Sequence, residues 1–425
     1  MNAAQETPHT NPNREASTGE EGPAVVVKNQ SDVWKNPAMA TTPTGTHAPL
    51  PALPNELKRL AEGVTFPDPM EAPGLRWGIL GAGGIARTFA RDVPAYTRSR
   101  IVAVAARELD RAEKFAREFG VGRAYGSYEE LAEDPEVDAI YVSTIHPFHA
   151  EHALLALRAG KPVLVEKAFT MSAGQAREVL DAAKQNRLFA MEAMWSSHLP
   201  HYRVIRQVVE NGGLGNVVSV QADHGQSLRH VDRLMRPELG GGSLLDLGIY
   251  PVSFLHEVLG VPDSVSASGR LISGDFGTAK ASGRPVRIDQ GITAVLQYGG
   301  STHGPEATGA SEPSALAVAR CNLDGRSATS AEIVFENGAL ELPQQFYRPG
   351  VLRLRLFGEG RPADGAVTDW DATVPGGFQY EAAEVARRLA SGATQSPDMT
   401  WEDTVEVMEI MDAIRDQVGI VYPWE

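Results

Sequence analysis

The chain has 425 residues, which leaves room for two domains of ordinary size and some additional length. Its composition, 42% hydrophobic and 22% charged, is typical of a globular protein, and no apolar run approaches the ~20 residues that cross a bilayer. The net charge of −15 argues against nucleic acid as a partner, because phosphate binding needs a basic surface.

Cysteine usage and the first residues bear on the compartment. Cys321 is the single cysteine, which excludes an intrachain disulfide and fits a reducing cytosol. The N-terminus has neither a basic region nor an apolar core of the kind that directs secretion. We therefore expect a cytoplasmic protein without a membrane partner.

Residues 1–74 differ in composition from the rest of the chain. They hold 11 of the 28 prolines and few aliphatic clusters that could offset the entropy of ordering. This predicts a disordered leader, with one short helix at Asn55–Glu62.

Residues 75–193 alternate short apolar runs with helical stretches. That order is typical of βαβ units and predicts an α/β domain with a doubly wound parallel sheet, in which ligands bind at the carboxyl ends of the strands. The strands are expected at Trp77–Leu80, Arg100–Ala106, Ala124–Tyr128, Asp138–Thr144, Pro162–Glu166 and Arg187–Glu192.

A glycine-rich turn follows the first predicted strand. Gly81, Gly83 and Ala86 have G-x-G-x-x-A spacing, and apolar residues at helical intervals come next. In a strand–turn–helix context this motif binds the pyrophosphate of a dinucleotide: the glycines allow the turn and the close approach, and the helix N-terminus attracts anions.

From Ala193 onward the apolar pattern changes to long alternating runs. Residues 194–425 are predicted to form an α+β domain around one large, mostly antiparallel sheet, with helices at Tyr380–Ala390 and Trp401–Val418. The Gly/Ser/Thr-rich stretch Ser301–Pro313 is expected to be a loop insertion. The runs expected as strands are Val217–His224, Ser264–Ile272, Val286–Tyr298, Ala315–Leu323, Ala328–Phe335 and Leu352–Phe357.

Three groups of residues could carry chemistry. Lys167 ends the fifth predicted strand, where a parallel sheet presents side chains to a ligand. Ser243 and Asp246 have capping-box spacing, so a helix is expected to begin there and to place Asp246 and Tyr250 on one face. His146 and His149 follow the fourth strand. Because no cysteine or further histidine cluster accompanies this pair, we expect no metal site.

These motifs together resemble the glucose–fructose oxidoreductase, inositol dehydrogenase and MocA family, and most closely its dimeric dihydrodiol dehydrogenases and NADP-dependent D-xylose dehydrogenases. The resemblance runs from Leu75 to the end of the chain, omitting the Ser301–Pro313 insertion. It rests on Arg76-Trp-Gly-Ile, Ala103-Val-Ala-Ala-Arg107, Ala124-Tyr-Gly-Ser-Tyr-Glu-Glu-Leu131, His146-Pro-x-His149, Glu166-Lys167, Met191-Glu-Ala-x-Trp195 and Leu244-Leu-Asp-Leu-Gly-Ile-Tyr250.

The resemblance implies a nicotinamide-dependent oxidoreductase that acts on a small sugar, cyclic polyol or dihydrodiol and forms a homodimer or higher homo-oligomer. It makes Lys167, Asp246 and Tyr250 the catalytic residues, although Ala168 stands where the family usually has the proline that restrains the lysine. Trp195 and His224 are expected to contact the substrate. The expected cofactor contacts are Gly81, Gly83, Gly84, Ile85, Ala86, Arg107, Thr144, His146, His149, Glu166 and Lys167.

Two further expectations concern electrostatics. Arg107 stands where an acidic residue would favour NAD, so NADP is expected as the preferred cofactor, with NAD still possible because Glu108 follows. Lowering a tyrosine pKa from ~10 to about 7.5 takes roughly 3.4 kcal/mol. A lysine ammonium ~4 Å away supplies about 4 kcal/mol at a dielectric of ~20. Lys167 is therefore expected to lower the pKa of Tyr250.

Other functions remain open at this stage. One is reduction of a keto-sugar or a bilin. Another is a catalytically silent NADP-binding sensor, although a sensor would need only the cofactor loop and not Lys167, Asp246 and Tyr250 together.

Overall fold

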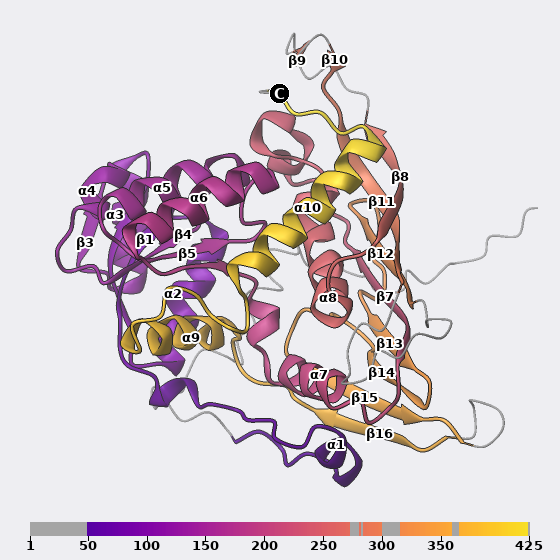
Figure 1. Ribbon diagram of the computed structural model, residues 1–425. Helices are drawn as coiled ribbons and strands as arrows, with labels where there is room; N and C mark the ends of the chain where they lie inside the picture. The colour runs from indigo at the N-terminus through magenta and orange to yellow at the C-terminus, as the bar shows by residue number, and fades with distance from the viewer. Residues whose placement is uncertain (1–48, 273–279, 282–283, 300–314, 359–364, 424–425) are drawn as a thin grey trace, which may run out of the picture. The chain divides into compact units, whose positions relative to one another are not determined.

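Six parallel strands form the first sheet of the computed structural model shown in Figure 1, which describes residues 49–272, 280–281, 284–299, 315–358 and 365–423. The strand order is β3-β2-β1-β4-β5-β6, and every pairing is parallel. This confirms the predicted doubly wound sheet. The strands are β1 (Arg76–Leu80), β2 (Arg100–Ala105), β3 (Arg123–Tyr125), β4 (Ala139–Val142), β5 (Val163–Glu166) and β6 (Ala190–Ala193).

Helices cover both faces of this sheet. Every residue of β4, β5 and β6 is buried, as expected for apolar strands packed on two sides. The strand order reverses between β1 and β4, and such a switch point opens a ligand crevice at the carboxyl ends of the strands. The helices of this region are α2 (Gly84–Tyr96), α3 (Leu109–Phe119), α4 (Tyr128–Ala132), α5 (His149–Arg158) and α6 (Ala173–Asn186).

The second sheet has eight strands in the order β16-β15-β14-β13-β7-β12-β11-β8. Only the pairing of β12 with β7 is parallel, so the predicted mostly antiparallel sheet is confirmed. β14 and β16 were not anticipated. The strands are β7 (Val217–Gly225), β8 (Ser264–Ile272), β11 (Ile288–Tyr298), β12 (Ala315–Asn322), β13 (Ala331–Phe335), β14 (Gly338–Leu342), β15 (Val351–Leu356) and β16 (Val367–Asp371), beside a small pair β9 (Lys280–Ala281) and β10 (Arg284–Pro285).

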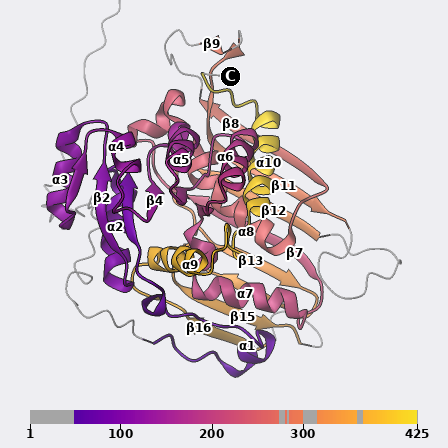
Figure 2. The ribbon, with the colours of Figure 1, turned by 60° about the vertical axis from the view of Figure 1, so that its left-hand side comes forward.

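Helices α7 (Pro200–Asn211), α8 (Ile249–Leu259) and α10 (Trp401–Val418) lie on one face of the second sheet (Figures 1 and 2). α8 packs on β7 and β12, and α10 contacts both β8 and α6, so α10 joins the two sheets. α9 (Phe378–Ala390) packs against α2. Tyr250 is the second residue of α8, and Asp246 lies in the π-helical turn, Leu244–Gly248, that precedes it.

Short turns of helix complete the chain. Within the described ranges, no helix combines the length and apolar character needed to cross a bilayer. The expected Ser301–Pro313 insertion lies outside the described residues. The short turns are Pro69–Glu71, His146–Phe148, Trp195–His198, Asp232–Met235 and Pro237–Leu239, with a π-helical turn at Leu244–Gly248.

Residues 49–74 are ordered, so placing the end of the disordered leader at residue 74 was wrong for this part. The predicted helix is confirmed as α1 (Asn55–Leu60), whose Leu57 and Leu60 are buried against the domain. The indole of Trp370 also donates a hydrogen bond to the carbonyl of Pro51 at 2.9 Å. Local proline content could not show this, because the apolar surface that α1 covers lies more than a hundred residues away. Residues 1–48 lie outside the described chain.

Candidate active site

The glycine turn after β1 forms a cradle at the switch point of the first sheet. Gly81 has φ +104°, and a Cβ there would lie 2.9 Å from the carbonyl oxygen of Ser143, so only glycine fits. A Cβ on Gly84, the first residue of α2, would meet no atom within 4 Å. Ala86, the third residue of α2, is fully buried. The free backbone N–H groups at the start of α2 suit a pyrophosphate.

A cavity of about 360 Å³ opens beside this turn. Four predicted cofactor residues line it: Gly81, Gly83, Arg107 and Thr144. Arg111 in α3, which no sequence motif indicated, lines it as well, four residues after Arg107. The cavity therefore combines a phosphate-binding turn with two guanidinium groups, which suits an anionic dinucleotide.

The remaining predicted cofactor residues lie elsewhere. Gly84 lines a smaller neighbouring cavity with Arg87, Arg111 and Lys114. Neither Ile85 nor Ala86 is among the residues that line the main cavity. His146, His149, Glu166 and Lys167 are also absent from its lining and instead surround the end of β5.

Two histidines hold the backbone after β5. His146 Nε2 donates to the carbonyl of Lys167 at 3.2 Å, and the ring nitrogens of His149 lie 2.9 and 3.0 Å from the carbonyls of Ala168 and Thr144. Burial lowers the pKa of His149 to about 4. A neutral ring has one N–H, so it donates to one of these carbonyls at a time. The two histidines thus hold the backbone on both sides of the Lys167–Ala168 bond.

The backbone around Lys167 is restrained although Ala168 replaces the proline of the resembling family. The Lys167–Ala168 peptide bond is cis. The N–H of Phe169 donates to Glu192 Oε1 at 3.0 Å, which adds to the bonds from His146 and His149. Buried side chains therefore bond to three successive residues, Lys167, Ala168 and Phe169.

Lys167, Asp246 and Tyr250 come together, as predicted. Lys167 Nζ donates to the backbone carbonyl of Asp246 at 2.7 Å and lies 4.6 Å from the centroid of the Tyr250 ring. The Asp246 carboxylate accepts a hydrogen bond from Arg233 at 2.6 Å. Burial opposes ionisation of Asp246, but Arg233 and Lys167 outweigh it and lower the pKa of this carboxyl.

The expected effect of Lys167 on Tyr250 was wrong. Burial raises the pKa of Tyr250 well above its usual value, and the nearby Glu166 carboxylate raises it further. Burial also lowers the pKa of Lys167, although Asp246 and Glu166 partly offset this. The expectation for Tyr250 considered only the Coulomb attraction of Lys167. Desolvation has the larger effect on the pKa of both Tyr250 and Lys167.

Aromatic side chains pack around Tyr250. Trp195 Nε1 donates to it at 3.3 Å, and the ring centroid of His224 lies 5.2 Å from that of Tyr250. Both residues were predicted to contact the substrate, and both lie at this wall. Tyr347, which was missed, lies 4.6 Å from Tyr250 and stacks on His224 at 4.5 Å. Burial lowers the pKa of His224 to about 3, so its ring is neutral.

The proposed capping box at Ser243 and Asp246 was wrong. Ser243 Oγ donates to Asp289 on β11, and the backbone N–H groups of Ser243 and Leu244 donate to the same carboxylate, each at 2.8 Å. Asp289 is fully buried. The cap of this helix therefore comes from a distant strand, and Asp246 is left to face Arg233.

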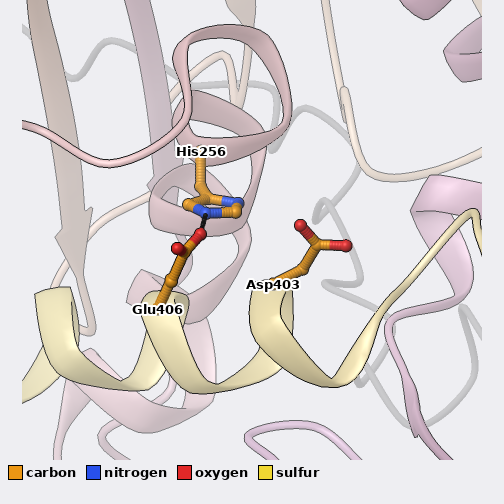
Figure 3. Close-up of side chains that lie close together, drawn as sticks. All are labelled: His256, Asp403 and Glu406. Carbon is orange, nitrogen blue, oxygen red and sulfur yellow. Dashed lines mark hydrogen bonds and ion pairs between the residues drawn. The ribbon is translucent and has the colours of Figure 1, made fainter.

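One group of histidine and acidic side chains outside this site meets the distance criterion for a metal among the described residues: His256, Asp403 and Glu406 (Figure 3). His256 Nε2 bonds to Glu406 Oε2 at 2.7 Å, which ties α8 to α10. Asp403 accepts bonds from the N–H and hydroxyl of Thr400, which cap α10. Helix packing and helix capping therefore explain why these three side chains lie close together.

Comparison with known proteins places this site in a family. One family model, described as an oxidoreductase family with an NAD-binding Rossmann fold, matches residues 75–193. A second, for the GFO/IDH/MocA C-terminal domain, matches residues 202–341. The chain belongs to the GFO/IDH/MocA family of NAD(P)-binding oxidoreductases.

Several individual proteins are similar along most of their length. Trans-1,2-dihydrobenzene-1,2-diol dehydrogenase from Danio rerio is 35% identical, over 82% of this chain and 98% of the relative. The Homo sapiens enzyme of that name is 32% identical over the same shares.

Solved structures show the same fold. A 3-ketoreductase from Actinomadura kijaniata, in complex with NADP and TDP-benzene, has a TM-score of 0.65 and 24% identity, over 82% of this chain and 99% of the other. Levoglucosan dehydrogenase, in complex with NADH and levoglucosan, has a TM-score of 0.67 and 18% identity, over 82% and 97%.

Proposed function

We propose that this protein is an NADP-preferring dehydrogenase that oxidises a carbinol carbon of a cyclic trans-dihydrodiol, with sugars and cyclic polyols as the neighbouring substrate class. The observation that carries the proposal is the position of Lys167 Nζ, between the Asp246 carbonyl and the ring of Tyr250, inside an aromatic wall. The dihydrodiol dehydrogenases that resemble the chain along 82% of its length support the substrate class.

The cavity beside Gly81 fits the proposed cofactor. Gly81, Gly83 and the first turn of α2 would hold the pyrophosphate, and Arg107 and Arg111 would bind a 2′-phosphate. Thr144, which follows β4, lines the same cavity and would contact the bound cofactor. A bound nicotinamide supplies the hydride acceptor in oxidation and the donor in reduction.

Lys167 is the group best suited to take the substrate proton. Its pKa is lowered by burial, which favours the neutral amine whose lone pair can accept a proton. As the C–H bond of the carbinol loses its hydride, the O–H proton passes to Nζ. Tyr250 keeps its proton because its pKa is raised, and its hydroxyl donates a hydrogen bond to the reacting oxygen. Asp246, paired with Arg233, holds the carbonyl that orients Nζ.

The aromatic wall favours a flat or partly apolar ring as substrate. The rings of His224, Tyr250 and Tyr347 lie together, with centroid separations of 4.5 to 5.2 Å. Such rings stack on an unsaturated cyclic diol, and they also fit the C–H face of a sugar.

The proposal is tested by following nicotinamide absorbance with trans-1,2-dihydrobenzene-1,2-diol, myo-inositol and D-xylose, each with NADP⁺ and with NAD⁺. We expect the largest kcat/KM for the dihydrodiol with NADP⁺. A preference for inositol or xylose would move the substrate to the polyol or sugar class. Binding of NADPH without turnover of any of the three would contradict the enzymatic role.

Cofactor preference has its own test. Arg107→Ala should weaken NADPH by ~1.5–3 kcal/mol, roughly 10- to 100-fold in Kd, because a charge-assisted bond to the 2′-phosphate is lost. NADH should change by less than about threefold. Arg100→Ala is the matched control, since Arg100 is exposed at the opposite end of β2. Equal losses for NADPH and NADH would show that Arg107 does not read the 2′-phosphate.

A further inference from the structure

The indole of Trp195 fixes the direction in which the Tyr250 hydroxyl can donate. Trp195 is 7% exposed and Tyr250 is 9% exposed, and Trp195 Nε1 lies 3.3 Å from the Tyr250 oxygen. An indole nitrogen donates only, so the phenol oxygen accepts in this bond. The hydroxyl hydrogen of Tyr250 then remains for another acceptor.

The position of Trp195 is set by the beginning of α9, far along the chain. The Trp195 ring stacks on Phe378 with centroids 4.8 Å apart and an interplanar angle of 21°. On the adjacent residue, a Cβ added to Gly377 would lie 2.3 and 2.6 Å from Cζ3 and Cε3 of the same indole. Any side chain at residue 377 would therefore push the indole out of place.

The turn at Gly377 is itself held rigidly. Gly377 has φ +146°, a conformation that favours glycine. Its N–H donates to Oε1 of Gln379 at 2.6 Å, and the Gln379 amide donates to the carbonyl of Pro375 at 2.7 Å. Gln379 is fully buried. The rigid turn therefore fixes the position that the Trp195 indole takes beside Gly377.

We propose that Trp195 is a positioning residue for Tyr250, and that Gly377 holds the Trp195 indole in the required position because it has no side chain. The inference rests on the proposed role of the Tyr250 hydroxyl toward the reacting oxygen. With its oxygen occupied by the Trp195 N–H, Tyr250 directs its hydrogen toward the substrate oxygen. This differs from the expectation that Trp195 serves as a substrate contact.

A double-mutant cycle separates the two roles. Trp195→Phe keeps an aromatic ring and removes the N–H. If Trp195 acts through Tyr250, kcat should fall roughly 3- to 10-fold, the value of one net hydrogen bond, with little change in KM. In the Tyr250→Phe background the same change should have almost no further effect on kcat, because the oxygen that accepts the bond is absent.

Gly377→Ala tests whether Gly377 determines the position of the Trp195 indole. It should lower kcat at least as much as Trp195→Phe, and the loss should be smaller in the Trp195→Phe background, where the shorter ring leaves space for the new methyl group. Gly392→Ala is the matched control, because Gly392 also has positive φ but an added Cβ there meets no atom within 4 Å. This control should change the unfolding midpoint without changing kcat.

The outcomes distinguish the inference from the proposed function. If Trp195→Phe raises KM equally in both backgrounds, Trp195 is a substrate contact and the inference fails while the proposed function stands. If Tyr250→Phe is as active as the wild type, both fail. If Gly377→Ala does not fold, the cycle with Trp195→Phe still decides the role of the indole.

Discussion

Glu166, Glu192 and Asp246 are buried near Lys167, and Glu381 is buried near Glu166. These four acidic side chains differ in the partners available to each. Asp246 has Arg233, and its pKa is lowered. Glu166 accepts a hydrogen bond from Tyr141, yet burial raises its pKa to about 7. Neither oxygen of Glu381 has a hydrogen-bond partner among the described residues, and burial raises its pKa well above the usual value. Arg233 and Lys167 thus keep Asp246 ionised, whereas burial disfavours ionisation of the other three carboxyls.

Glu192→Gln should make the protein more stable at alkaline pH. Burial raises the pKa of Glu192 to about 8, so this group penalises the folded state increasingly as the pH rises from its unfolded pKa near ~4.5 through 8. The amide oxygen can still accept from Phe169, while the penalty disappears. The gain in unfolding free energy, measured by urea denaturation, should grow from about 1 kcal/mol at pH 5 to on the order of 5 kcal/mol at pH 9.

Glu130→Gln, on the exposed side of α4, is the control for that measurement. A gain from Glu192→Gln that is the same at pH 5 and pH 9 would mean that Glu192 is ionised in both the folded and the unfolded state over this range, and would contradict the raised pKa.

At the scale of elements, features encoded locally were predictable and those encoded by distant contacts were not. The glycine spacing at Gly81, the alternation of strands and helices, and the place of Lys167 just after β5 can all be recognised from residues adjacent in sequence. The cap of the helix that carries Asp246 and Tyr250 depends on Asp289, 46 residues after Ser243. Tyr347 reaches the site from the loop after β14, and α9 brings Gly377. Spacing within a motif carries no information about such partners.

Asp289→Ala should destabilise both the fold and the site. It removes the acceptor of two backbone N–H groups and one hydroxyl in a fully buried position, each costing about 1–3 kcal/mol when left unsatisfied. Ser243→Ala removes only the hydroxyl and should cost less. Thermal unfolding and kcat of both variants check this. Equal effects of the two variants would contradict the role of Asp289 as the helix cap.

On the scale of the whole molecule, α10 and the segment at residues 49–74 connect parts that are distant in sequence. α10 contacts α6 of the first sheet and β8 of the second. The early segment bonds to Trp370, and Asn211 donates to the carbonyls of Leu60 and Glu62 at 2.9 and 3.1 Å. The chain before β1 is therefore part of the folded structure from residue 49 onward.

A chain that begins at Met70 should be less stable than one that begins at residue 49. It lacks α1, and each of the buried Leu57 and Leu60 contributes about 1.5–3 kcal/mol by burial. We expect a lower unfolding midpoint with cofactor affinity retained, because α1 lies on α7 and not at the cofactor cavity. Equal midpoints for the two chains would show that the packing of α1 contributes nothing to stability.

The most direct test of the proposed mechanism is the dependence of kcat/KM on pH, in the oxidation direction, for the wild type, Lys167→Met and Tyr250→Phe. If Lys167 accepts the proton, activity should rise with pH along a limb that reports the lowered lysine pKa. Lys167→Met should lose that limb and at least ~10²-fold in activity. Tyr250→Phe should keep the limb at a lower plateau. The reverse result, a limb retained in Lys167→Met and lost in Tyr250→Phe, would identify Tyr250 as the base and contradict the account.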